Sequence, residues 1–216
     1  MNGDAPLLVA ATDDERLAAG DFDTRLESLL EAGCSAVWLR SRALADRALL
    51  ARACSVRERC DAHGAALWVG GRADVAALAG AGHVQLPERG LSVAGARRAA
   101  GPGVSVGRSV HSAGAARAAA REGADLLVAG PVFATRSHPA REAAGLALLA
   151  DVRAALAAEG RLGLPLVAIG GLTPERAAAA VEAGADGVAA IRALWEADDP
   201  GAAARAFLAA LRRTAR

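Results

Sequence analysis

Short apolar runs alternate with longer amphipathic segments along the whole of this 216-residue chain. The short runs are largely apolar throughout, which is typical of strands that are covered on both faces of a parallel sheet. The longer segments place apolar residues at helical spacing. The pattern predicts strands at residues 7–11, 36–39, 66–69, 83–86, 104–107, 126–129, 166–169 and 187–191. It predicts helices at residues 23–32, 44–63, 73–79, 93–99, 113–122, 146–159, 174–183 and 202–211.

Eight strand-then-helix units favour a (β/α)8 TIM barrel, formed as a single domain by residues 1–216. The phrases AREGADLLVAG and VEAGADGVAAI both contain a helix end, a glycine and a buried strand, as stacked units of one kind would. A doubly wound open sheet is the alternative, but it normally has a glycine-rich turn after the first strand. Here Thr12-Asp13-Asp14 follows that strand, so the barrel is the favoured interpretation.

Composition and charge exclude several classes of function. Hydrophobic residues make up 53% of the chain, and 25 basic side chains nearly balance 24 acidic ones, so no nucleic-acid partner is expected. No apolar run reaches the ~20 residues of a membrane span, and no signal peptide precedes the first strand. A cytoplasmic protein without a membrane partner is therefore expected. Three cysteines without a C-x-x-C pair indicate reduced thiols. Alanine-rich outer helices are compatible with a homodimer.

The loops after the seventh and eighth predicted strands form the candidate phosphate site. Barrels of this kind carry their chemistry at the C-terminal ends of the strands and often bind phosphate there. Gly170 and Gly171 let backbone N–H groups approach an anion, and the helix that opens at Pro174 adds a favourable dipole. Ile191 and Arg192 would close the other side of the phosphate. The alternative is that the two glycines serve only the geometry of the turn.

Six segments, in order along nearly the whole chain, carry a resemblance to a known family. They are VWLRSR at 37–42, GRADVAAL at 71–78, HVQLPERGLS at 83–92, GRSVHS at 107–112, AGPVFAT at 129–135 and VAIGGLTPERAAAAVEAGADGVAAI at 167–191. With these segments the chain resembles the thiamine-phosphate synthase/TenI family. The resemblance implies a TIM barrel whose partner is a small phosphorylated thiazole, with the phosphate bound by Gly170, Gly171, Ile191 and Arg192.

Two activities are associated with this family, a synthase and a thiazole tautomerase. The synthase joins a pyrimidine pyrophosphate to the thiazole phosphate, and its Mg²⁺ is held by an Asn-Asp pair after strand three and an aspartate after strand four. Here those places hold Gly70-Gly71 and Gly90, and Trp38 replaces the usual strand-two glutamine. The loss of these ligands favours the tautomerase, a metal-independent isomerase, so no cofactor is expected unless the chain is a synthase. The synthase and a non-catalytic phosphate-binding protein remain alternatives.

A tautomerase needs a proton-transfer group, and histidine suits this role because it titrates near neutrality. The resemblance places the tautomerase's histidine just after strand six, but Pro131 stands there in this chain, within a Gly-Pro-Val-Phe sequence that resembles the synthase. His138, in the following loop, is the first candidate, and His111, after strand five, is the second; a solvated loop residue and a helix cap are the alternatives. Trp38 would form either the floor of the pocket or part of the core. The other candidate binding residues are Arg40, Arg42, Ser109, Thr135, Arg136 and Ser137.

Overall fold

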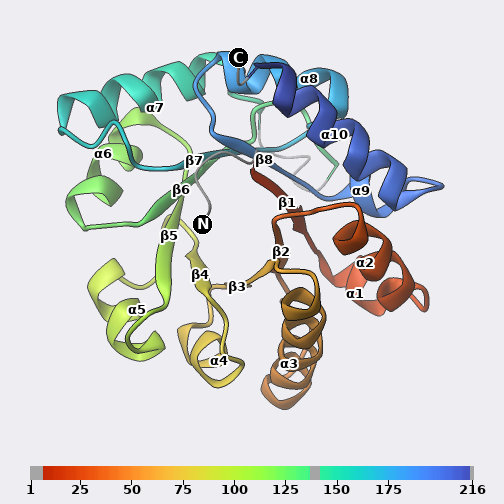
Figure 1. Cartoon of the computed structure of the whole chain (residues 1–216). Helices are drawn as coiled ribbons and strands as arrows, with labels where there is room; N and C mark the ends of the chain where they lie inside the picture. The colour runs from red at the N-terminus through yellow and green to blue at the C-terminus, as the bar shows by residue number, and fades with distance from the viewer. Residues whose placement is uncertain (1–6, 137–141, 215–216) are drawn as a thin grey trace.

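Eight parallel strands close into a barrel in the computed structural model, which describes residues 7–136 and 142–214 (Figure 1). Each strand pairs with its neighbour in chain order, and β1 also pairs with β8, which closes the sheet. The predicted (β/α)8 fold is therefore confirmed. The strands are β1 (Leu7–Ala11), β2 (Ala36–Leu39), β3 (Ala66–Gly70), β4 (His83–Leu86), β5 (Ser105–Val110), β6 (Leu126–Ala129), β7 (Leu166–Ile169) and β8 (Gly187–Ala190).

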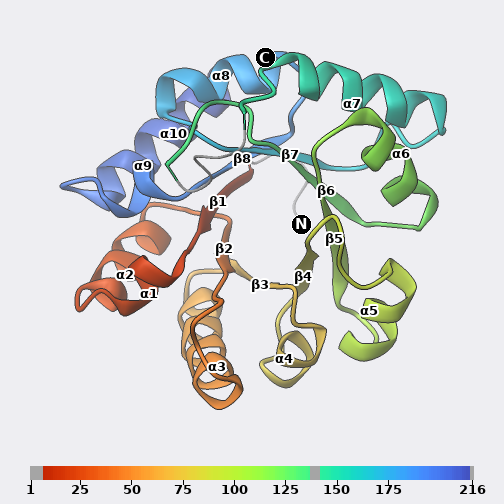
Figure 2. The same ribbon diagram turned by 180° about the vertical axis from the view of Figure 1, so that it is seen from behind.

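Helices surround the barrel on its outer side in both views (Figures 1 and 2). The last helix packs against both α8 and α2, so the two ends of the chain's helical ring meet there. The helices are α1 (Asp14–Ala18), α2 (Phe22–Glu31), α3 (Asp46–Ala62), α4 (Ala73–Leu78), α5 (Val93–Ala100), α6 (Ala113–Arg121), α7 (Ala147–Ala158), α8 (Pro174–Glu182), α9 (Arg192–Trp195) and α10 (Pro200–Thr214).

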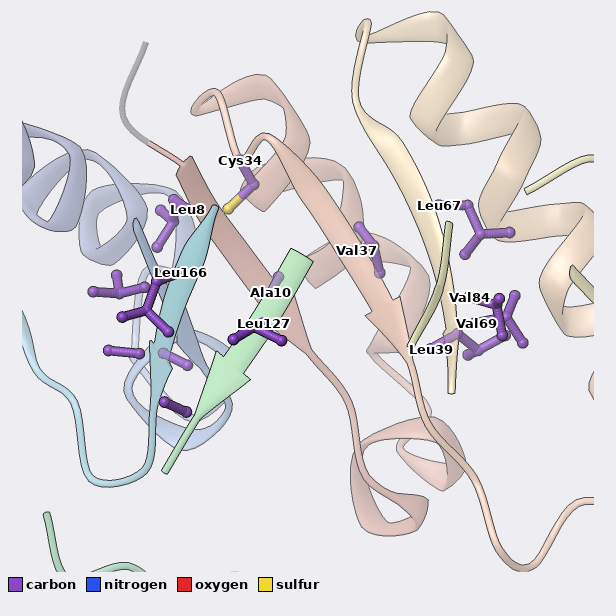
Figure 3. Packing of buried hydrophobic residues seen from close by; sticks show 14 of the residues in the cluster. Leu8, Ala10, Cys34, Val37, Leu39, Leu67, Val69, Val84, Leu127 and Leu166 are labelled. Atoms are coloured by element: carbon purple, nitrogen blue, oxygen red, sulfur yellow. The ribbon is translucent and has the colours of Figure 1, made fainter. Parts of the chain in front are cut away.

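Strand side chains alternate between two apolar layers. Outward-facing residues such as Leu8 and Val37 pack between the strands and the helices (Figure 3). Inward-facing residues such as Val9, Trp38 and Trp68 fill the interior of the barrel. Because both faces of each strand are covered, six of the eight strands are made of apolar residues, and only β4 and β5 carry polar side chains.

The observed elements begin and end within three residues of the predicted ones, with three informative differences. The helices α1 and α9 were not predicted, because five and four residues are too few to show helical periodicity. The strand β5 extends beyond the predicted end at residue 107. The prediction stopped short because Arg108 and Ser109 are polar and do not look like residues of a buried strand. No helix among the described residues is long and apolar enough to cross a membrane.

The three cysteines differ in accessibility, which predicts their reactivity. Cys34 and Cys60 are buried, and burial raises the pKa of both thiols to about 12, whereas Cys54 is partly exposed. Because the thiolate is the reactive form, we expect a thiol reagent at pH 8 to label Cys54 alone in the folded protein and all three cysteines in denaturant. Mass spectrometry after labelling measures this, and Cys54→Ser should leave the folded protein unlabelled. Rapid labelling of Cys34 in folded protein would contradict the burial argument.

Candidate active site

A pocket of about 1230 Å³ lies at the C-terminal ends of the strands. All eight loops that follow the strands contribute residues to its lining, so it forms the mouth of the barrel. The side chains lining it include six arginines and four carboxylates, which gives the mouth a positive balance suited to an anionic ligand. The arginines are Arg40, Arg42, Arg89, Arg136, Arg176 and Arg192.

Gly170 and Gly171 form a turn between β7 and α8 that only glycine fits. Both have a positive φ, +104° and +61°, which side chains rarely adopt. A Cβ on Gly170 would lie 2.6 Å from the Cα of Pro131, and one on Gly171 would lie 2.4 Å from the Ala134 carbonyl oxygen. The two glycines therefore pack directly against the β6 loop. Close packing accounts for these glycines. Both residues line the pocket, and neither backbone N–H donates a hydrogen bond to another described residue.

Cationic side chains lie beside this turn. Two of them form ion pairs with Glu196, a residue that the sequence analysis did not single out. The Glu196 carboxylate pairs with Arg192, the first residue of α9, at 3.2 Å and with Arg136 of the β6 loop at 3.2 Å. Arg176 donates to the Gly171 carbonyl oxygen at 2.8 Å and lies over the Phe133 ring. One side of the mouth thus combines two glycines whose backbone N–H groups have no acceptor among the described residues with guanidinium groups, a combination suited to a phosphate.

Arg40 and Arg42 line a second cationic region, at the end of β2. The buried Thr12 hydroxyl accepts a hydrogen bond from the Arg40 backbone N–H at 2.9 Å and donates to the Arg40 carbonyl oxygen at 3.2 Å. The Asp14 carboxylate accepts from the Ser41 hydroxyl at 2.5 Å and from the Arg42 backbone N–H at 3.0 Å. The Ser41 hydrogen bond lowers the pKa of Asp14. The β1 loop therefore fixes the backbone that carries both arginines.

A chain of buried polar side chains links the barrel interior to the pocket. His83 is 4% exposed, with Nδ1 at 3.0 Å from the Ser105 hydroxyl and Nε2 at 2.9 Å from the Gln85 amide oxygen. The Gln85 amide nitrogen donates to the Ser109 hydroxyl at 3.2 Å, and Ser109 lines the pocket. A Cβ on Gly107 would lie 2.1 Å from the Gln85 amide oxygen, so only glycine leaves room for this chain. This series of hydrogen bonds from His83 through Gln85 fixes the direction of the Ser109 hydroxyl.

His111 forms a dyad with Glu88 at the rim of the pocket. The Glu88 carboxylate lies 2.7 Å from His111 Nδ1 and accepts the His111 backbone N–H at 2.9 Å. Both side chains are about one-third exposed. The carboxylate at Nδ1 fixes the orientation of the ring and leaves Nε2 as the ring nitrogen without a hydrogen-bond partner among the described residues. The dyad can therefore present a proton or a positive charge to a bound ligand.

Ten of the twelve residues expected at the site lie among the described residues, and all ten line the same pocket. His138 and Ser137 lie outside the described residues. Sequence reasoning did not assign roles to Thr12, Gln85 or Glu196, and it did not pair Glu88 with His111. Only the inward position of His83 and Gln85, two residues apart on one strand, was a signal that could have revealed the buried chain. The ten are Arg40, Arg42, Ser109, His111, Thr135, Arg136, Gly170, Gly171, Ile191 and Arg192.

The described residues at the mouth do not form a divalent-cation site made by the protein alone. No three histidine, cysteine, aspartate or glutamate side chains come together among them, so a cation held there would need substrate phosphate and water as further ligands. Gly71 has φ +72°, and a Cβ on Gly90 would lie 2.9 Å from Pro87 Cδ. The two places where the family's synthase is expected to carry carboxylates are thus shaped for glycine. The pocket carboxylates Asp14 and Glu88 already accept hydrogen bonds from the protein.

Comparison with known proteins agrees on one family. Residues 8–194 match the sequence profile described as thiamine monophosphate synthase. The chain is 44% identical to a thiamine-phosphate synthase of Methanoculleus marisnigri, over 90% of both chains. It is 47% identical to a thiamine biosynthesis bifunctional protein of Symbiobacterium thermophilum, of which it covers 38%. Among solved structures, a thiamine phosphate pyrophosphorylase from Pyrococcus furiosus superposes with a TM-score of 0.84, at 27% identity over 98% of both chains.

These relatives contradict the expectation of a thiazole tautomerase, and with it the assignment as an isomerase. The full-length relatives that share 41–44% of their residues with the chain are named thiamine-phosphate synthases. The expectation rested on the segments HVQLPERGLS and GRSVHS, which resemble the tautomerase branch, and on the missing carboxylates. It failed because the absence of metal ligands bears on the metal and does not identify the reaction. The matched profile spans most of the barrel, and the similarity to full-length relatives extends over nearly the whole chain. The chain belongs to the thiamine monophosphate synthase family.

Proposed function

We propose that this protein joins a pyrimidine that carries a pyrophosphate group to a thiazole phosphate and releases pyrophosphate. The observation that carries the proposal is the 44% identity, over 90% of both chains, to a protein named thiamine-phosphate synthase. The pocket supports it, because cationic groups lie both at the β7 and β8 loops and at the end of β2. Two anionic substrates need two such regions.

The bond changes are those of a substitution at carbon. The thiazole nitrogen forms a bond to the exocyclic methylene carbon of the pyrimidine, and the bond from that carbon to the pyrophosphate oxygen breaks. The electron pair of the broken bond leaves with pyrophosphate, and the thiazole nitrogen becomes positively charged. The protein must therefore orient the two rings and stabilise negative charge on the departing oxygen. We assign this stabilisation to arginine and histidine side chains, with no step through a metal.

The phosphate of the thiazole is assigned to the turn of Gly170 and Gly171. Their free N–H groups and the guanidinium of Arg192, held by Glu196, supply donors on two sides of one anion. Ile191 and Ser109 line the same pocket, and Ser109 offers a hydroxyl whose direction is fixed by Gln85. Thr135 and Arg136 of the β6 loop complete this side. The proposal places the thiazole between the phosphate turn and Ser109.

The His111–Glu88 dyad is assigned to the leaving group. A protonated imidazole can donate a hydrogen bond to the departing pyrophosphate, and the Glu88 carboxylate 2.7 Å from Nδ1 holds the ring in place. Removal of a donor that acts on developing charge typically costs a factor of about 100 or more in turnover. His111 therefore acts more strongly on kcat than on the binding of the thiazole phosphate.

The test is the formation of thiamine phosphate from the two substrates, followed by fluorescence after oxidation and by the release of pyrophosphate. We expect both products from the wild-type protein in a ratio of one to one. We expect His111→Ala to lower kcat by about 100-fold or more, with a smaller change in the KM for thiazole phosphate.

His63→Ala is the matched control, because His63 also pairs with a carboxylate, at 2.5 Å from Glu27, but does not line the pocket. It should keep wild-type turnover. No product under any condition would refute the proposed function. Equal turnover in His111→Ala and wild type would refute the role of the dyad alone.

A second candidate function, a phosphate-binding protein without transferase activity, is favoured by one observation. The positions where the family's synthase is expected to hold its metal are glycines here, and Gly90 has no room for a side chain. Such a protein would bind thiazole phosphate in calorimetry. It would form no thiamine phosphate, whichever of the two substrates is added first. The same pair of measurements therefore separates the two candidates.

A further inference from the structure

Arg108 is a buried cation that faces away from the barrel interior. Its neighbours on β5, Gly107 and Ser109, face inward, toward the polar side chains of β4. Side chains alternate along a strand, so Arg108 points to the opposite side of the sheet, toward the helices. It is 5% exposed and lies beside Leu86, its strand partner and the last residue of β4. A buried guanidinium is costly unless its donors find acceptors, so its acceptors indicate what it does.

The acceptors of Arg108 lie near both ends of the β4 loop, which connects β4 to α5. Its Nη1 donates to the Pro87 carbonyl oxygen at 3.0 Å, and its Nη2 donates to the Leu91 carbonyl oxygen at 2.8 Å. Nη2 also donates to the Glu122 carboxylate at 2.9 Å. The same Glu122 oxygen accepts the backbone N–H of Val93, the first residue of α5, at 3.2 Å. One guanidinium thus ties the beginning and the end of the β4 loop to β5.

Between these two anchors the β4 loop carries Glu88. The loop begins as a tight turn, in which the Gly90 N–H donates to the Pro87 carbonyl oxygen at 3.0 Å. Glu88, in this turn, accepts the backbone N–H of His111 and lies against its Nδ1, just beyond the end of β5. The dyad joins the loop to β5 on the pocket side, and Arg108 joins the same loop to the same strand on the helical side. A loop held at both ends leaves the Glu88 carboxylate few positions relative to His111.

We propose that Arg108 is a positioning residue of the His111–Glu88 dyad. Its guanidinium, held by Glu122, sets the place of the Glu88 carboxylate and thereby the direction in which His111 presents Nε2 to the leaving group. The planar guanidinium suits this role, because its fixed fork of donors reaches acceptors at separate points of the loop. Arg108 does not line the pocket, so it acts only through the β4 loop. The inference rests on the proposed function for the role of the dyad in turnover, whereas the placement of Glu88 can be measured without substrate.

The first measurement is the kcat of thiamine phosphate formation in Arg108→Met, which keeps an unbranched side chain and removes the donors. We expect kcat to fall about tenfold or more, because a displacement of about 1 Å at a reacting group can cost a factor of about 100. The KM for thiazole phosphate should change less. In the His111→Ala background the same substitution should lower kcat less than about twofold, because a residue that acts through the dyad has no effect once the dyad is gone. Equal factors in both backgrounds would overturn the inference.

The second measurement is the hydrogen exchange of backbone amides, followed by NMR without substrate. The Glu88 carboxylate protects the His111 N–H, and we expect Arg108→Met to speed its exchange by about tenfold or more. The Val106 N–H, which donates to Asp125 at the beginning of the same strand, should exchange as in the wild type. Unchanged protection of the His111 N–H in Arg108→Met would refute the inference. Because this readout needs no turnover, it decides on Arg108 even if the wild-type protein forms no thiamine phosphate.

Arg153→Met is the matched control. Arg153 also donates to backbone carbonyl oxygens, those of Leu164 and Gly184 among them, but it does so where β7 and β8 begin, at the other end of the barrel. Its replacement should lower the midpoint of thermal unfolding and leave kcat unchanged. Arg108→Lys keeps the charge beside Glu122 but lacks the planar fork, so it should restore stability more than kcat. If Arg108→Met does not fold, Arg108→Lys decides the question by the same two measurements.

Discussion

Replacement of Gly171 by alanine is expected to lower the affinity for thiazole phosphate at least about tenfold and to destabilise the fold by about 2 kcal/mol. The backbone at Gly171 has φ +61°, a conformation that costs an alanine roughly 1–2 kcal/mol. In addition, the new Cβ would lie 2.4 Å from the Ala134 carbonyl oxygen and 2.8 Å from Phe133 Cβ. Neither neighbour is the end of a flexible side chain, so the β6 and β7 loops must separate. The N–H groups that we propose to bind the phosphate then lose their alignment.

Calorimetry with thiazole phosphate and thermal unfolding would measure the two effects separately. Gly163→Ala is the matched control, because a Cβ at Gly163 has no atom within 4 Å and its φ lies outside the left-handed region. It should change neither quantity by more than the error. Wild-type phosphate affinity in a folded Gly171→Ala protein would show that the turn serves packing alone, which was the alternative considered for the two glycines.

The stability of the protein is expected to fall as the pH is lowered through the range in which His83 titrates. Burial lowers the pKa of His83 to about 4, from an ordinary value near 6.5 in the unfolded chain. Above pH 6.5 both states hold a neutral imidazole, and the difference has no effect. Between pH 6.5 and 4 the unfolded state binds the proton and the folded state does not, so the free energy of unfolding decreases. At 1.36 kcal/mol per pKa unit, the total loss is about 3 kcal/mol.

Urea unfolding at pH 7 and at pH 4.5, in the wild type and in His83→Gln, measures this contribution. Carboxylates titrate in both proteins, so the difference between the two pH profiles isolates His83. The variant should be less stable than the wild type at pH 7, because it interrupts the chain from Ser105 to Gln85, and it should lose about 2–3 kcal/mol less on acidification. Parallel profiles would show that the imidazole is protonated in the folded state.

The fold could be predicted from the hydrophobic pattern, because a strand that is buried on both faces is a short run of apolar residues in the sequence. The run Leu166–Ile169 is apolar throughout, is followed by two glycines and Pro174, and reads as a buried strand and the start of a helix without any distant information. Elements without such a pattern were missed or predicted too short. The helix α9 was missed because it has only four residues. The end of β5 was missed because it contains the polar Arg108, which is buried because Glu122 and two backbone carbonyls accept its hydrogen bonds.

The site was predictable where its residues sit at strand ends. Arg40, Ser109, Gly170 and Arg192 each follow or finish a strand, and parallel strands bring all such positions to one face. Partnerships across the mouth were not predictable. Glu196 joins Arg192 to Arg136, 60 residues earlier in the chain, and Glu88 meets His111 from the neighbouring loop. No periodicity encodes a contact between side chains on separate loops.

The sequence by itself determined the barrel, the glycine turn after β7 and the family, because each depends on residues that are close along the chain or on short motifs in a fixed order. It did not determine the reaction, since glycines at the expected metal positions are consistent with more than one chemistry. Only the tertiary structure decided that Gly90 has no room for a side chain, that Trp38 keeps an unpartnered N–H beside Arg40, and that His83 reaches the pocket through Gln85. These facts depend on distances of a few ångströms between different strands and loops, which are set when the barrel closes.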